Sequence, residues 1–378
     1  MTRIFFDHNS TTNILSKARE AFDACLSEPH NPSSIHSFGR ASRQAIEDAK
    51  KKILASLNLS SLAYEVIFTS SGTEANNLAI NGVDCEEILI SNIEHLSILE
   101  AAKHSGKSNI IISVDKNGLI DLDELEQKVQ ESDSKKLISI IYANNETGVI
   151  QNIREIANVV KKHNCLIHSD CSQAYGKIKL DLSDCNLDAI TISGHKIGAH
   201  QGVAAIIKKK SLNLKPLMHG GGQEFGIRPG TENVPAICGL GAIANDIIEI
   251  NNKYSGLASL RNLIEDELKS ASDNVEFLSE KVDRLPNTSS ICFNGIDNNL
   301  ILIQLDLAGF AVSAGSACSS GKIEPSYVIK AMTHDVDKAK NTIRVSLGLD
   351  NTKEQIKKFI DTCKEIIEKQ NSNIKMRA

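Results

Sequence analysis

The stretch VIFTSSGTEANN, residues 66–77, joins a short apolar run to a helix-like segment through a turn that contains Gly72. Amphipathic segments such as residues 121–130 and 152–164 separate several further runs of this kind, which lie at residues 87–92, 110–114, 137–145, 166–170, 189–195 and 202–208. Continuous apolar strands that alternate with helices are typical of a mostly parallel sheet covered on both faces. The sequence therefore predicts an α/β fold built on such a sheet.

The pattern changes after the last of these runs. Residues 251–261 predict a long helix that leads away from the sheet, and the runs at residues 290–296, 300–318 and 342–349 indicate a smaller α+β unit. The first dozen residues lack helical periodicity, and we expect them to lie near the functional site as an extended arm. We therefore predict a large domain of residues 13–255 and a small domain of residues 1–12 and 256–378.

Composition argues against several classes of protein. The 378 residues carry a formal net charge of -5, with Lys and Arg spread along the chain, so we expect no nucleic-acid or membrane-surface partner. No apolar segment is long enough to span a membrane, and Asp7 interrupts the N-terminus before a signal-peptide core could form. The nine cysteines include no CxxC pair, which argues against a disulfide framework and a structural zinc site. We therefore expect a cytoplasmic protein with no bound metal.

Polar side chains follow several of the predicted strands at their carboxyl ends, which is the edge where ligands bind in such sheets. Asp170 and Gln173 follow one strand, and His195 and Lys196 follow the next. Gly72 and the residues after it open a helix whose free amides favour an anion such as phosphate. A plain capped helix is the simpler alternative for this motif.

Lys196 and Asp170 each suggest a specific chemistry. A lysine kept from bulk water has a lowered pKa and can form a Schiff base with an aldehyde, although an isolated lysine is more often a surface residue. Asp170 could keep a pyridine nitrogen protonated, or it could simply cap a helix. A phosphate-binding turn, a strand-end Asp and Lys196, in that order on one sheet edge, are together the parts that a pyridoxal phosphate site requires.

Two residues of the smaller unit are further candidates. Cys318 is flanked by small residues in AVSAGSACSSG, residues 311–321, which suits a loop that presents a nucleophile. An incidental loop cysteine is the alternative. Arg344 lies in the apolar run TIRVS, where a lone arginine often binds a carboxylate and a structural ion pair is the competing explanation.

These motifs, taken in order, resemble the cysteine desulfurases of the NifS/IscS type, within the class V aminotransferase family. The resemblance runs nearly from end to end and rests on FFDHNSTT (5–12), NPSSIHSFGR (31–40), TSSGTEANNLAI (69–80), the segment at His95, YANNETGVIQ (142–151), HSDCSQAYGK (168–177), SGHK (193–196), HGGGQEFGIRPGTENV (219–234), VSAGSACSSGKIEPSYV (312–328) and IRVSLG (343–348). It implies fold type I of the pyridoxal-phosphate-dependent transferases, with a seven-stranded, mostly parallel sheet in a large domain and a smaller α+β domain.

The resemblance implies that the cofactor is pyridoxal 5'-phosphate. Lys196 would hold the cofactor covalently, Asp170 would pair with its pyridine nitrogen, His95 would stack on the ring and assist proton transfer, and Gln173 would contact the phenolic oxygen. The implied cofactor-binding set is Gly72, Thr73, His95, Asn145, Asp170, Gln173, Ser193, His195, Lys196 and Thr231. Within it, the residues implied to hold the phosphate are Gly72, Thr73, Ser193 and His195.

The resemblance also implies partners and a reaction. Thr231 would reach the phosphate of a neighbouring subunit, which makes the protein a homodimer, and Asn145 and Arg344 would hold the carboxylate of L-cysteine. With Lys196 and His95 as the other catalytic residues, the thiolate of Cys318 would take the sulfur as a persulfide and leave L-alanine. An iron–sulfur scaffold is the expected acceptor, and another acceptor, for example in tRNA thiolation, is the alternative.

Four other functions are alternatives to a cysteine desulfurase. A selenocysteine lyase is the nearest, because sequence does not fix the site geometry that selects the substrate. A small-amino-acid transaminase would not need Cys318 or its loop. A nicotinamide-dependent dehydrogenase is excluded because no predicted strand is followed by GxGxxG. A binding protein that kept the fold and lost catalysis is disfavoured by the presence of both Lys196 and Cys318.

Overall fold

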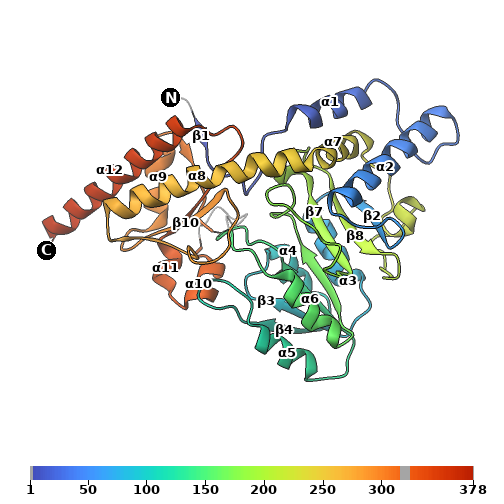
Figure 1. Ribbon diagram of the computed structural model, residues 1–378, viewed down its shortest axis with the longest axis horizontal. Helices are drawn as coiled ribbons and strands as arrows, with labels where there is room; N and C mark the ends of the chain where they lie inside the picture. Colours follow the sequence, from blue (N-terminus) through green and yellow to red (C-terminus); the bar gives the residue numbers. More distant parts are fainter. Residues whose placement is uncertain (1–2, 316–323, 378) are drawn as a thin grey trace.

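A seven-stranded sheet forms the centre of the larger part of the chain in the computed structural model, which describes residues 3–315 and 324–377 (Figure 1). Its strands lie in the order β2 (Tyr64–Thr69), β8 (Ala204–Lys209), β7 (Ala189–Ser193), β6 (Leu166–Asp170), β5 (Lys136–Ile141), β3 (Glu87–Ser91) and β4 (Ser108–Ile112). Only β8 runs antiparallel to its neighbours. The predicted mostly parallel sheet is confirmed.

Helices cover both faces of this sheet because its strands are apolar on both sides. Along β2, Val66 and Phe68 belong to one buried cluster and Ile67 to another, as the alternation of side chains across a strand requires. The helices of this part are α1 (Ser16–Cys25), α2 (Ser37–Ser56), α3 (Gly72–Gly82), α4 (Leu96–Lys103), α5 (Leu122–Gln130), α6 (Ile153–Lys162) and α7 (Val234–Asn245).

The smaller part contains an antiparallel sheet of β9 (Val275–Phe277), β10 (Thr288–Phe293) and β12 (Thr342–Ser346), with β10 in the middle. Its helices are α9 (Asn298–Leu307), α10 (Tyr327–Thr333), α11 (Val336–Lys340) and α12 (Lys353–Arg377). The chain's beginning joins this part, because β1 (Ile4–Phe5) pairs with β11 (Phe310–Ala311). The expected small α+β unit is therefore present.

One long helix, α8 (Ile247–Ala271), runs from the larger part into the smaller one (Figure 1). The expected boundary between residues 255 and 256 falls inside this continuous helix, so the division into two domains stays a prediction. None of the described helices is by itself long and apolar enough to cross a bilayer; α7 and α8 pass that test only as a pair, bent by 70°.

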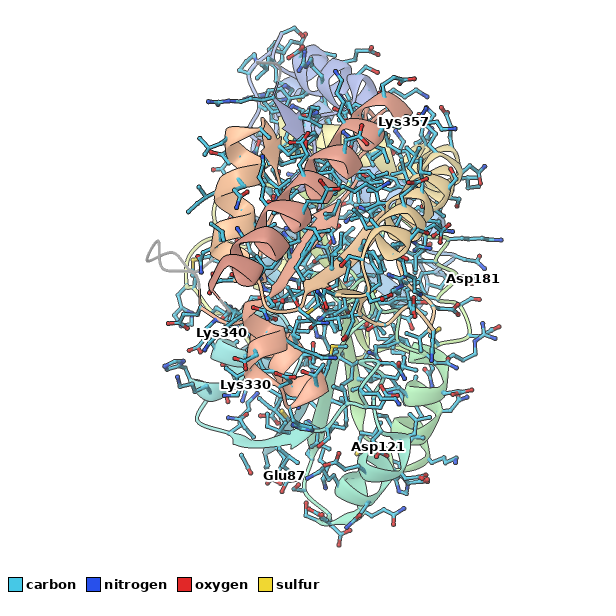
Figure 2. The ribbon with its side chains drawn as sticks, turned by 90° about the vertical axis from the view of Figure 1, so that its left-hand side faces the viewer. Glu87, Asp121, Asp181, Lys330, Lys340 and Lys357 are labelled. Atoms are coloured by element: carbon cyan, nitrogen blue, oxygen red, sulfur yellow. The ribbon has the colours of Figure 1, made fainter. Side chains whose placement is uncertain are left out.

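Charged side chains cover the outside of both parts. Figure 2 shows Asp121 and Asp181 on the larger part and Lys330 on the smaller one, and all three are exposed. Charges of both signs are thus dispersed over many elements, as the sequence indicates.

Candidate active site

A cavity of about 390 Å³ lies at the carboxyl ends of β5, β6 and β7. It is lined by residues of both parts of the chain and by the N-terminal arm, which confirms the expected place of that arm. The predicted site residues that line it are Gly72, Thr73, His95, Asn145, Asp170, Gln173, Ser193, His195, Lys196 and Arg344. Among the described residues, Thr231 is exposed and does not line this cavity. Cys318 lies outside the described residues.

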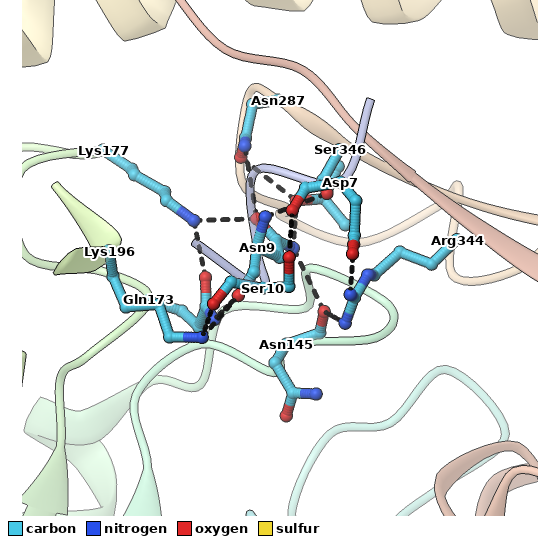
Figure 3. A network of polar contacts seen from close by, with 11 residues as sticks. Asp7, Asn9, Ser10, Asn145, Gln173, Lys177, Lys196, Asn287, Arg344 and Ser346 are labelled. Atoms are coloured by element: carbon cyan, nitrogen blue, oxygen red, sulfur yellow. Dashed lines mark hydrogen bonds and ion pairs between the residues drawn. The ribbon is translucent and has the colours of Figure 1, made fainter. Parts of the chain in front are cut away.

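Lys196 lies in the single helical turn that follows β7. Its Nζ donates to the main-chain oxygens of Asn9 and Ser10, each at 2.7 Å (Figure 3). Burial lowers the pKa of this amine to about 8, and the positive charge of Arg344 adds to the effect. Near neutral pH a larger share of this amine is therefore neutral than of an ordinary lysine, and the neutral form is the one that attacks an aldehyde.

Asp170, at the end of β6, is held by neutral donors. Its Oδ1 accepts from the main-chain N of Ser172 at 2.9 Å, and its Oδ2 accepts from Nδ2 of Asn76 at 2.8 Å. Because neither partner carries a charge, the carboxylate keeps its charge available for a protonated ring nitrogen in the cavity. Sequence reasoning did not single out Asn76, although it lies four residues after Gly72 and so on the same face of α3.

Both histidines of the site are held neutral. The main-chain N of Ser97 donates to Nδ1 of His95 at 3.1 Å, so in the neutral ring the hydrogen is on Nε2. Burial lowers the pKa of His95. Burial also lowers the pKa of His195 to about 4, and the nearby charge of Lys196 acts in the same direction. Neither ring therefore adds a positive charge to the cavity at neutral pH.

The start of α3 provides an anion site. Ser71 caps the helix by accepting from the main-chain N of Glu74, which leaves other amides of the first turn free. Gly72 packs closely against the end of β7 and the turn after β6, since a Cβ there would lie 3.3 Å from Cβ of Ser193 and 3.4 Å from Oγ of Ser172. This cradle of amides and hydroxyls fits the phosphate group of pyridoxal phosphate.

Arg344, in the middle of β12, reaches the cavity from the smaller part. Its Nη2 forms an ion pair with Oδ1 of Asp7 at 2.5 Å, and its Nη1 donates to the main-chain oxygen of Asn145 at 3.0 Å. Nε of Arg344 is buried and has no hydrogen-bond partner among the described residues. Because Arg344 lines the cavity and a guanidinium has five N–H donors, this side chain could also bind a ligand carboxylate.

The segment IGAHQG, residues 197–202, follows Lys196 directly. The imidazole of His200 stacks on the ring of Phe22 in α1, with 4.1 Å between the ring centroids. Gly198 adopts a φ of +86°, and a Cβ there would lie 2.5 Å from Cγ of Leu15. This loop therefore packs against α1 and the residue before it, and Lys196 lies in the turn after β7.

Comparisons with known proteins agree with this architecture. A family model described as "Aminotransferase class-V" matches residues 4–359. A protein named "Cysteine desulfurase IscS" from Dictyoglomus turgidum is 38% identical over 377 residues, which cover 97% of this chain and 95% of the relative. The chain belongs to the class V aminotransferase family. Members of this family depend on pyridoxal phosphate, and the cavity fits that cofactor at Lys196, Asp170 and the start of α3.

Two further relatives support this family assignment. A "Putative cysteine desulfurase IscS 1" from Bacillus subtilis is 36% identical over 369 residues, which cover 94% of this chain and 96% of the relative. The crystal structure of a NifS-like protein from Rickettsia africae superposes with a TM-score of 0.90 at 40% identity, covering 97% of this chain and 99% of that chain. The predicted fold type I is confirmed by this likeness.

Proposed function

We propose that this protein is a pyridoxal-phosphate-dependent cysteine desulfurase. The observation that carries the proposal is one cavity that joins an amine of lowered pKa, Lys196, to the carboxylate of Asp170 and to the guanidinium of Arg344. An amino acid bound there would have its carboxylate on Arg344 and its amino group toward Lys196. The relatives named cysteine desulfurase match the chain over nearly its whole length, which supports cysteine as the substrate.

Each residue of the cavity has a proposed task. When bound, pyridoxal phosphate supplies an electron sink for the bond that breaks at the amino acid's carbon. Lys196 holds the cofactor and carries protons to and from the α-carbon, since its amine can titrate near neutral pH. Asp170 keeps the ring nitrogen protonated. His95 packs on the ring and handles a second proton through Nε2.

The sulfur step is proposed to use Cys318, which lies outside the described residues. Its thiolate attacks the sulfur of bound cysteine, so a sulfur–sulfur bond forms as the carbon–sulfur bond breaks. The electron pair of the broken bond stays with carbon, which takes up a proton and leaves as alanine. In the overall reaction, cysteine and the thiol of Cys318 are converted into alanine and a persulfide on Cys318. Iron–sulfur cluster assembly through a scaffold protein is the proposed destination, in a reducing cytoplasm.

A homodimer is part of the proposal. Thr231 lies in the segment between β8 and α7, which also carries the exposed apolar side chains Met218 and Phe225. Exposed apolar groups that lie together on a surface mark an interaction site. A second subunit that covers this segment would bring Thr231 to the phosphate of the partner's cofactor.

The function is tested by giving the purified protein pyridoxal phosphate, L-cysteine and a reductant. We expect alanine and sulfide in equal amounts, with no requirement for a 2-oxo acid. Selenocysteine serves as the second substrate, because a selenocysteine lyase would release selenide from it and leave cysteine intact. A protein that binds the cofactor and produces alanine only when a 2-oxo acid is added is a transaminase, and the proposal is then wrong.

The lowered pKa of Lys196 predicts how cofactor uptake depends on pH. Only the neutral amine reacts with the aldehyde, so the rate of pyridoxal phosphate uptake by the cofactor-free protein should rise with pH and level off above about 8. The reference compound is a lysine amide that is acetylated on its main-chain nitrogen only, so its side-chain amine is free and has an ordinary pKa. Its reaction rate with pyridoxal phosphate should keep rising up to about pH 10.4. Stopped-flow absorbance measures both rates. A protein whose rate keeps rising to the pH of the reference amine would contradict the lowered pKa.

A further inference from the structure

Lys177 is fully buried directly behind the cavity, with 0% of its surface exposed. It lies four residues after Gln173, in the turns that follow β6, and does not itself line the cavity. Its Nζ donates to Oε1 of Gln173 at 2.5 Å and to Oδ1 of Asn9 at 2.7 Å (Figure 3). The sequence motifs and the proposed mechanism assign this amine no task, although burying one is costly.

The contacts of Lys177 help to determine which way the amide of Gln173 points. The amine donates to Oε1, and the main-chain oxygen of Asn9, which can only accept, faces Nε2, so the two contacts together set the orientation of the amide. Nε2 of Gln173 then lies on the other side, where one N–H donates to the main-chain oxygen of Asn9 at 2.9 Å. The second N–H of Nε2 remains for the cavity, which Gln173 lines.

The same amine fixes Asn9. Oδ1 of Asn9 accepts from Lys177 and, at 3.2 Å, from Nδ2 of Asn287. Nδ2 of Asn9 then donates to the main-chain oxygen of Asn145 at 3.0 Å and to Oγ1 of Thr288 at 2.9 Å. Through Asn9, whose main-chain oxygen also accepts from Lys196, this cluster ties the arm to both parts of the chain.

The amine does not need a charge for this task. Burial lowers the pKa of Lys177 well below its ordinary value, and the positive charges of Lys196 and Arg344 act in the same direction. A neutral amine has two N–H groups, and the two acceptors, Gln173 and Asn9, use both. Lys177 can therefore orient two amides at the cofactor site without bringing a further positive charge to it.

We propose that Lys177 is a positioning residue that holds the amide of Gln173 with an N–H toward the bound cofactor. The inference rests on the proposed function, since the acceptor in the cavity would be an oxygen of the pyridoxal ring. Without Lys177, this orientation leaves Oε1 of Gln173 buried with no donor. Of the contacts described for the amide, the bond from Nε2 to the main-chain oxygen of Asn9 then remains, so the N–H is held toward the cofactor less firmly.

The test is a double-mutant cycle on cofactor affinity in the full-length protein. The dissociation constant of pyridoxal phosphate is measured by titrating the cofactor-free forms of the parent, Lys177→Met, Gln173→Leu and the double variant. We expect Lys177→Met to weaken binding about tenfold in the parent and less than about twofold in the Gln173→Leu background. Lys136→Met is the matched control, because Lys136 is 2% exposed and lies at the opposite end of β5.

Each outcome decides one question. Equal losses from Lys177→Met in both backgrounds, or no loss in the parent, would overturn the proposal, as would an equal loss in Lys136→Met. If Lys177→Met does not fold, Gln173→Glu tests the same orientation with Lys177 present: it replaces the N–H with an acceptor, and unchanged affinity would overturn the proposal. A parent protein that fails to bind pyridoxal phosphate would instead refute the proposed function.

Discussion

Replacing Arg344 with Leu should raise the KM for L-cysteine about a hundredfold and lower the free energy of unfolding by about 3 kcal/mol. The guanidinium is only 7% exposed and carries the one ion pair described for Asp7, at 2.5 Å. Removing it leaves the Asp7 carboxylate without its counter-charge beside a cavity, which accounts for the stability loss. The same change removes the proposed fork for the substrate carboxylate, which accounts for the higher KM.

A second buried arginine separates these two effects. Arg284 is paired with Glu265 in the smaller part, at 2.9 and 3.0 Å, and its side chain is 4% exposed. Arg284→Leu should cost similar stability and leave the KM unchanged. Asp7→Asn combined with Arg344→Leu should recover part of the stability and none of the substrate affinity. If Arg344→Leu and Arg284→Leu changed the KM equally, Arg344 would be a structural residue only. Chemical denaturation and steady-state kinetics supply the two readouts.

Much of the fold could be predicted because short apolar runs in the sequence mark the strands of the sheet. All seven predicted apolar runs are strands of one sheet, since a strand buried on both faces must be apolar at nearly every position. The antiparallel direction of β8 could not be predicted, because such a run reads the same in either direction. The small β9, of three residues, was too short to give a pattern.

The site residues that could be predicted are those that lie at or directly after the end of a strand. Asp170 and Lys196 stand at strand ends, and parallel strands bring their carboxyl ends to one edge. Contacts between distant parts of the chain were not predictable. The pairing of Asp7 with Arg344 joins residues 337 apart in sequence, and the bond from Lys177 to Asn9 joins residues 168 apart. No periodic pattern in the sequence relates such distant residues. They meet because the N-terminal arm folds back to the edge of the sheet.

Replacing Lys196 with Met should abolish the absorbance band of the lysine-bound cofactor and lower the rate of alanine formation by about a thousandfold or more. Methionine fills a similar volume but has no amine to hold the cofactor or to move a proton. It also leaves the main-chain oxygens of Asn9 and Ser10 without the donor that Nζ provides. Cys318→Ser is the contrasting variant: it should keep the absorbance and lose sulfide production, because it alters only the sulfur acceptor.

The Lys196→Arg variant distinguishes chemistry from support of the N-terminal arm. A guanidinium can still donate to the oxygens of Asn9 and Ser10, so the arm should keep its anchor and the protein its stability. It stays protonated at every accessible pH, however, and cannot react with an aldehyde or take a proton. We therefore expect Lys196→Arg to be as inactive as Lys196→Met but more stable than it. Activity in Lys196→Arg would mean that Lys196 acts by holding the arm, and the proposed chemistry at this residue would be wrong.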